Sequence, residues 1–69
     1  MPPNTRYRLT LVRESGQAVT SEFSGYHAEH CGDTILGKEI ESGRWVYARL
    51  TLIDINGSLL DLRREWIKP

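Results

Sequence analysis

The chain has 69 residues, of which 39% are apolar and 26% charged, and nine basic residues balance nine acidic ones. This length fits one small domain, residues 1–69, with room for one sheet and one helix rather than for a deep substrate cleft. The zero net charge counts against a dedicated nucleic-acid binder, because phosphate contacts usually require a basic excess.

The N-terminal segment and the cysteine usage indicate a cytoplasmic protein. The opening MPPNTR lacks the apolar core of a signal peptide, and no stretch is long enough to cross a membrane. The single cysteine, Cys31, excludes an intramolecular disulfide and suits either a reducing cytosol or an intermolecular bond. Because Pro2 and Pro3 prevent regular structure, residues 1–5 are predicted to form a disordered tail.

Two short stretches near the N-terminus alternate between apolar and polar residues. Alternation over residues 6–14, and more weakly over 17–24, predicts two strands joined by a three-residue loop in which Gly16 is left-handed. A two-residue loop would mix the two faces of the hairpin. The predicted register sets Tyr7 against Phe23, Leu9 against Ser21 and Leu11 against Val19 on one face, with Arg8–Glu22 and Thr10–Thr20 on the other.

The middle of the chain, residues 24–43, is predicted to be a helix. Ser24 is a candidate N-cap, Gly43 suits the C-terminal end, and apolar residues recur at helical spacing at Ala28, Cys31, Ile35, Leu36 and Ile40. The internal Gly32 and Gly37 indicate close contact with the sheet or a break near Gly32-Asp33. The alternative is a strand over residues 34–41 that leads into Trp45 and gives a small five-stranded barrel.

A second hairpin is predicted over residues 45–67, again with a three-residue loop, residues 55–57. One face then carries Leu52–Leu60, Leu50–Leu62 and Val46–Trp66, together with Ala48 and Arg64. The other face carries Ile53–Leu59, Thr51–Asp61, Arg49–Arg63, Tyr47–Glu65 and Trp45–Ile67. Asp54 is predicted to begin the turn through its side-chain oxygen.

These elements predict an α+β fold of the order ββαββ, with a four-stranded antiparallel sheet and one helix packed on one face. The strand order is left open by the pattern. The helix is expected to bury the leucines of the inner sheet face, namely Leu9, Leu11, Leu50, Leu52, Leu60 and Leu62.

A cluster of polar residues at the start of the predicted helix is the best candidate for chemistry. His27, His30 and Cys31 lie near Glu29 and Asp33, which are residue types that bind zinc or form a Cys–His nucleophile pair. An intramolecular tetrahedral site would need carboxylates or a second subunit, and one helix on one sheet offers no obvious cleft. We therefore expect solvated histidines and a packed cysteine, and we predict no enzyme activity, no catalytic residue, no metal and no cofactor.

The outer sheet face is the predicted functional surface. Aromatic and arginine side chains are frequent anchors of protein interfaces, and a bare sheet face usually marks a contact. Arg49 opposite Arg63 would be unfavourable unless an acidic partner intervenes. The predicted partner-binding residues are Arg8, Trp45, Tyr47, Arg49, Ile53, Leu59, Arg63 and Ile67. Two alternatives use the same residues: long arginine side chains that merely cover apolar neighbours, and a nucleic-acid-binding module.

The order of elements, the helix end 41-ESGRW-45 and the turn 54-DING-57 resemble small proteins encoded by phages and mobile elements, including anti-CRISPR inhibitors. The resemblance covers nearly the whole chain and is one of size and pattern, so it transfers no functional residue. It implies a stoichiometric inhibitor or adaptor that binds a host defence or regulatory protein, as a monomer or a homodimer. Such proteins are frequently acidic, and the neutral charge of this chain argues against DNA mimicry.

Overall fold

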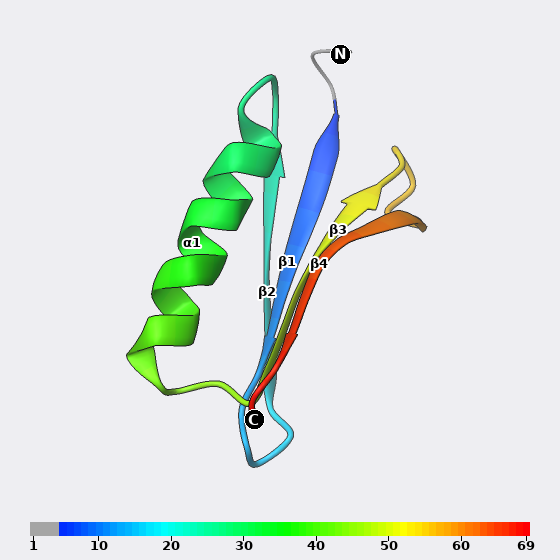
Figure 1. Ribbon diagram of the computed structural model, residues 1–69. Coiled ribbons are helices and arrows are strands. Elements are labelled where there is room, and N and C mark those ends of the chain that lie inside the picture. The colour runs from blue at the N-terminus through cyan, green and yellow to red at the C-terminus, as the bar shows by residue number, and fades with distance from the viewer. Residues whose placement is uncertain (1–4) are drawn as a thin grey trace.

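The computed structural model describes residues 5–69, which form four strands and one helix in the order ββαββ (Figure 1). The elements are β1 (Arg6–Val12), β2 (Ala18–Ser24), α1 (Ala28–Ser42), β3 (Tyr47–Ile53) and β4 (Leu59–Ile67). All neighbouring strands are antiparallel, and their order across the sheet is β2-β1-β3-β4. The predicted α+β fold is confirmed, and β2 and β4 are the two edges of the sheet.

The β1–β2 hairpin follows the predicted register throughout. All five predicted residue pairs are observed, without a shift along the seven paired positions. The N–H of Arg13 donates to the carbonyl of Gln17 at 2.8 Å and closes a three-residue loop in which Gly16 has a φ of 94°. Glycine adopts this left-handed conformation readily, so the loop closes while the two strands stay in register.

Helix α1 begins later than predicted and continues without a break. Ser24 is the last residue of β2 rather than an N-cap, and His27 precedes the helix without a side-chain capping bond. At the other end, Gly43 adopts a φ of 76° and its N–H bonds the carbonyl of Ile40, as a C-terminal glycine does. Because residues 34–41 are helical, the alternative of a five-stranded barrel is wrong.

The two glycines inside α1 have different surroundings. A Cβ atom added at Gly32 would lie 2.7 Å from Cδ1 of Leu50, so the absence of a side chain allows the helix to approach β3 closely. A Cβ atom at Gly37 would meet nothing within 4 Å. The predicted close contact with the sheet is therefore confirmed at Gly32 and not at Gly37.

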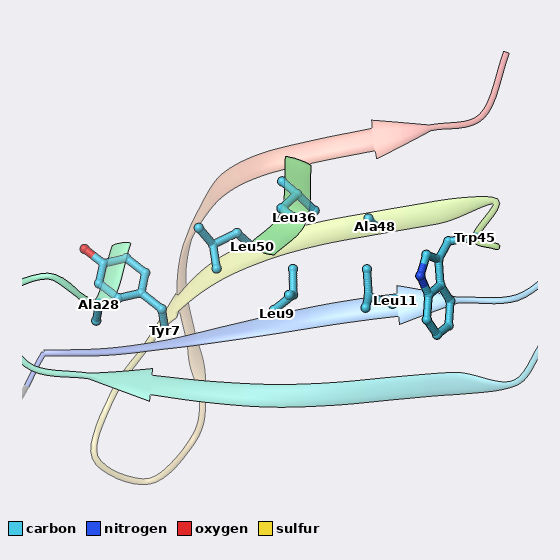
Figure 2. Close-up of a cluster of buried hydrophobic side chains, with 8 residues drawn as sticks. All are labelled: Tyr7, Leu9, Leu11, Ala28, Leu36, Trp45, Ala48 and Leu50. Atoms are coloured by element: carbon cyan, nitrogen blue, oxygen red, sulfur yellow. The ribbon is translucent and has the colours of Figure 1, made fainter. Parts of the chain in front are cut away.

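The core lies between α1 and the β1–β3 centre of the sheet (Figure 2). It consists of side chains from both central strands, the helix and the α1–β3 connection: Tyr7, Leu9, Leu11, Ala28, Leu36, Trp45, Ala48 and Leu50. Phe23, Ile40, Leu52 and Trp66 pack against it and are partly buried. The predicted core leucines of β1 and β3 are confirmed, Leu52 in part.

The β3–β4 hairpin departs from the predicted register. Its turn is as expected: Gly57 has a φ of 85°, and Asp54 accepts bonds from the N–H groups of Asn56 and Ser58 at 2.8 and 2.9 Å. Beyond the Ile53–Leu59 pair, however, the ladder shifts twice, and Leu60 and Arg63 have no direct partner on β3. These two β-bulges change the face of the residues between them.

The predicted burial of Leu60 and Leu62 is wrong for this reason. Leu62 lies opposite Thr51 on the outer face instead of opposite Leu50, and Leu60 is displaced by the first bulge. The Leu62 side chain is 45% exposed and that of Leu60 is 59% exposed.

Of the tail predicted over residues 1–5, residues 1–4 lie outside the described part of the chain. The carbonyl of Thr5 accepts a bond from the N–H of Gly25 at 3.1 Å, which extends the β1–β2 ladder. Within residues 5–69, α1 falls short of the length and apolarity that crossing a membrane requires.

Candidate protein-binding surface

Strand β4 lies outside the area covered by α1, the helix found in the described residues 5–69. Helix α1 packs against β1, β2 and β3, and β4 lies beyond it at the edge of the sheet. Four large aliphatic side chains of β4 remain between 45% and 66% exposed, and three of them lie on the outer face, opposite Tyr47, Thr51 and Ile53, where α1 does not pack. We call this set the β4 strip; it consists of Leu59, Leu60, Leu62 and Ile67. Isolated exposed aliphatic residues are ordinary, but several on one strand form a surface that can be buried by a partner.

Charged side chains connect α1 to β4. Arg64 donates to both carboxylate oxygens of Asp33, at 2.8 and 2.9 Å. Arg63 contacts Glu29 at 3.2 Å and Asp61 at 3.0 Å. These side chains are all more than a third exposed, so each pair contributes little to stability. Their geometry nonetheless fixes which side of β4 faces the helix.

Glu29 is also bound from within the core. The Tyr7 hydroxyl donates to Glu29 Oε1 at 2.8 Å. This hydrogen bond, supported by Arg63, lowers the pKa of the Glu29 carboxyl. Burial, followed by the same hydrogen bond, raises the pKa of Tyr7. A phenol, a carboxylate and a guanidinium therefore join the core to the inner side of β4.

The predicted place of Arg63 is wrong. Its contact with Glu29 on α1 puts it on the helix side of the sheet, and the second bulge leaves it without a β3 partner. Arg49 lies opposite Glu65 rather than opposite Arg63. The predicted clash of two arginines is thus replaced by a pair of opposite charge.

The predicted place of Trp45 is also wrong. Strand β3 begins at Tyr47, and Trp45 turns into the core, where it is 5% exposed. Its indole N–H donates to Glu39 Oε2 at 2.7 Å, and the Arg13 guanidinium lies 4.9 Å from the ring centroid. A tryptophan held in this way closes the end of the core and is not a free anchor for a partner.

Ile53 keeps its predicted face but not its predicted exposure. It lies on the outer side between Arg6 and Leu59, yet it is 3% exposed. The β3–β4 turn reaches back toward β1, since Arg6 Nη1 donates to the carbonyl of Ile55 at 3.1 Å. Neighbouring side chains therefore cover Ile53, and it offers no apolar area to a partner.

The other five predicted residues lie on the outer face as expected. Leu59 and Ile67 are exposed members of the β4 strip, and Arg49 is exposed beside them. The Tyr47 hydroxyl donates to Glu65 Oε2 at 2.6 Å, and this bond raises the pKa of the phenol.

Arg8, the fifth of these residues, pairs with Glu22 at 3.2 Å across the β1–β2 ladder. Its charge is therefore already matched within the chain. The surface that emerges is narrower than predicted and shifted toward β4.

Sequence reasoning missed Leu60 and Leu62, although β4 contains a signal that marks them. Each bulge coincides with a doublet that breaks the alternation, Leu59-Leu60 and Arg63-Arg64. In the second, both arginines reach carboxylates of α1, so two consecutive side chains share one side of the sheet. A regular strand would place them on opposite sides.

The histidine and cysteine cluster does not converge. Within residues 5–69, no group of three or more metal-ligating side chains comes together. His30, Cys31, Thr34 and Ile35 line a shallow depression of about 280 Å³ on the flank of α1. Cys31 is exposed there, so the prediction that it is packed is wrong.

Comparison with known proteins found no matching family model, no matching curated protein and no matching solved structure.

Proposed function

We propose that this chain is a small non-enzymatic protein-binding module that binds a host protein through its β4 strip. By binding, it either inhibits that protein or acts as an adaptor for it. The observation that carries the proposal is the exposure of Leu59, Leu60, Leu62 and Ile67 on the edge strand β4. The resemblance in size and pattern to phage-encoded inhibitors stays a prediction. A cytoplasmic location also remains part of the proposal.

The chemistry of the strip defines the partner. Burying one large aliphatic side chain completely contributes about 1.5–3 kcal/mol, so the strip can supply the apolar centre of an interface. Arg49 and Glu65 lie beside it on the outer face and would form a polar rim of mixed sign. The partner surface should therefore be an apolar groove or ridge with both charges at its margin.

The nucleic-acid alternative draws on arginines that are already engaged. Arg8, Arg63 and Arg64 each pair with a carboxylate of the chain, and Trp45 is buried. Base stacking and phosphate binding need such groups free. These contacts favour a protein partner over a nucleic acid.

The test compares two variants of the full chain with the wild type. The double variant Leu59→Asp/Leu62→Asp places charge in the strip. The control Tyr26→Asp changes a side chain that is 69% exposed on the β2–α1 connection. Each protein is immobilised and exposed to extract of its own host cells, and any captured protein is then purified and titrated back in solution.

We expect a protein that forms a complex of fixed stoichiometry with the wild type and with Tyr26→Asp, and that binds the double variant at least tenfold more weakly. Circular dichroism should show all three chains folded. Equal binding of the folded double variant would reject the β4 strip as the binding surface.

A further inference from the structure

We propose that β2 joins two copies of this chain into a dimer, through antiparallel pairing of β2 with β2 about a two-fold axis at Ser21. This proposal uses the edge opposite to the β4 strip and does not depend on it. In the dimer the sheet becomes continuous across eight strands. The two β4 strips then lie at its far ends.

The first observation is the regularity of the β2 edge. All seven residues of β2 pair one-to-one with β1, and six of the seven are exposed. Natural sheets protect their edges with lysine, proline, inward-pointing charges or bulges, and an edge without them is a template for another strand. Strand β2 contains no lysine, arginine or proline, and Glu22 is its one charged residue.

The direction of the backbone groups follows from the hydrogen bonds that flank the strand. The N–H of Arg13 bonds the carbonyl of Gln17, and the N–H of Gly25 bonds that of Thr5. Bonded pairs alternate in an antiparallel ladder, so the odd-numbered residues of β2 bond to β1. The even-numbered residues direct their N–H and C=O groups to the open edge; they are Ala18, Thr20, Glu22 and Ser24.

A two-fold axis at Ser21 satisfies all of these groups together. Thr20 then faces Glu22 of the second copy, and Ala18 faces Ser24, so even-numbered residues meet even-numbered ones as hydrogen bonding requires. The whole of β2 overlaps with its copy. Centring on Glu22 would oppose two carboxylates, and centring on Thr20 would leave Phe23 and Ser24 beyond the β2 overlap.

The side chains that face each other in this register also form favourable pairs. On the inner face, Val19 of each copy faces Phe23 of the other, and the two Ser21 residues face each other. Val19 is 39% exposed in the single chain. The axis therefore pairs a β-branched residue with an aromatic one twice, which is a favourable cross-strand combination.

Helix α1 also places one exposed apolar side chain, Ile35, on its flank toward this edge. Glu29 and Asp33 reach β4, while Gly32 and Leu36 face the sheet. Ile35 lies on the opposite flank by helical geometry, which is the β2 side, and it is 38% exposed beside the shallow depression. A two-fold axis perpendicular to the sheet keeps both helices on one side, so the two flanks border the new junction.

Charge does not oppose the association of two identical copies. Nine basic and nine acidic residues give each chain a formal net charge of zero. Proteins with little net charge associate more readily than strongly charged ones, because long-range repulsion is weak. A second copy is thus the partner that matches both the backbone register and the charge of this edge.

The first experiment measures the molar mass of the full chain by sedimentation and light scattering across a concentration series. We expect a reversible dimer of twice 7.9 kDa. Thr20→Pro removes an N–H that β1 does not use, so the chain should fold and dissociate to monomers, with at least a tenfold weaker association.

Glu65→Pro is the matched control on the other edge. The bond from the N–H of Lys68 to the carbonyl of Val46 makes the even-numbered residues at this end of β4 the ones bonded to β3. The N–H of Glu65 is therefore directed outward, as that of Thr20 is. We expect Glu65→Pro to remain dimeric, and a dimer that Thr20→Pro leaves intact would overturn the proposal.

A cross-linking measurement tests the register without introducing proline. In a Cys31→Ser background, Ser21→Cys places one thiol of each copy at the axis. The Cα atoms of a non-hydrogen-bonded antiparallel pair are about 4.5 Å apart, which lies within the range of about 4.4–6.8 Å that a disulfide needs. We expect rapid oxidation to a covalent dimer. Thr20→Cys in the same background is offset by two residues and should cross-link much more slowly. Equal rates, or a wild type that stays monomeric at about 1 mM, would contradict the proposal.

Discussion

The two edges of the sheet have the same kind of turn but differ in regularity. Strand β2 matches β1 residue for residue, whereas β4 has nine residues and inserts two extra ones against the seven of β3. The regular edge presents backbone donors and acceptors in an unbroken row. The bulged edge interrupts that row and instead presents side chains, because each bulge aims a leucine or an arginine in a new direction. One edge is thus suited to strand pairing and the other to side-chain recognition.

The centre of the sheet supports both edges, so truncating a core side chain there should have the largest effect on stability. Leu50 is fully buried on β3 and packs against Gly32 of α1. Leu50→Ala should lower the free energy of unfolding by about 2–5 kcal/mol, the usual cost of a large-to-small change in a core. Denaturant unfolding followed by circular dichroism measures this loss. If β2 survives while β4 melts, the two edges are not supported by one core.

Replacing the carboxylates that attach each edge should cause a smaller loss of stability, localised to that edge. Glu29 connects α1 to β4, whereas Glu22 connects β2 to β1 through Arg6 and Arg8. Glu29→Gln should cost about 0.5–1 kcal/mol after allowance for solvent screening. It should accelerate amide hydrogen exchange in β4 but not in β2. Glu22→Gln is the matched control, with the opposite pattern of exchange.

The same carboxylates give a pH dependence of defined sign. The pKa of Glu29 is lowered by the Tyr7 hydrogen bond and that of Glu22 by its bonds from Arg6 and Arg8. Their contribution is therefore present above the unfolded-state pKa and is lost as the pH falls through the lower folded-state value. Thermal unfolding should show stability decreasing below about pH 4. Glu29→Gln should flatten part of this decrease, and an unchanged profile would contradict the role of Glu29.

The smallest effect is expected on the β4 strip itself. Leu62→Thr should change the free energy of unfolding by no more than about 0.5 kcal/mol, as is usual for a surface position. Leu52→Thr is a matched control, because Leu52 packs against the core and should cost clearly more. A loss of about 2 kcal/mol in Leu62→Thr would show that Leu62 is part of the core, as simple alternation had predicted.

Local sequence patterns determined much of the fold but less of the candidate surface. The glycines Gly16, Gly43 and Gly57 mark backbone conformations that depend on the residue itself, so the turns and the helix end were predictable. The register of β1–β2 followed from its loop. The predicted register of β4 was wrong because a bulge depends on contacts across the fold. Here two consecutive arginines form ion pairs with Glu29 and Asp33 of α1.

Trp45 was misplaced for a related reason. The pattern places Trp45 in line with Tyr47, but the chain enters β3 only after turning the indole back onto α1. The hydrogen bond to Glu39 comes from α1, and the Arg13 ring contact comes from the β1–β2 connection, which is distant in the chain. Such contacts cannot be read from alternation alone.

The buried position of Trp45 provides the molecule with its own optical probe. Its ring is enclosed by the core, while the second tryptophan, Trp66, is partly exposed on β4. Fluorescence from Trp45 should therefore follow docking of α1 onto the sheet, and a Trp66→Phe background would isolate that emission. With Trp45→Phe instead, Trp66 becomes a reporter of events at β4. Docking of the helix and packing of β4 can thus be observed separately, without attaching any dye.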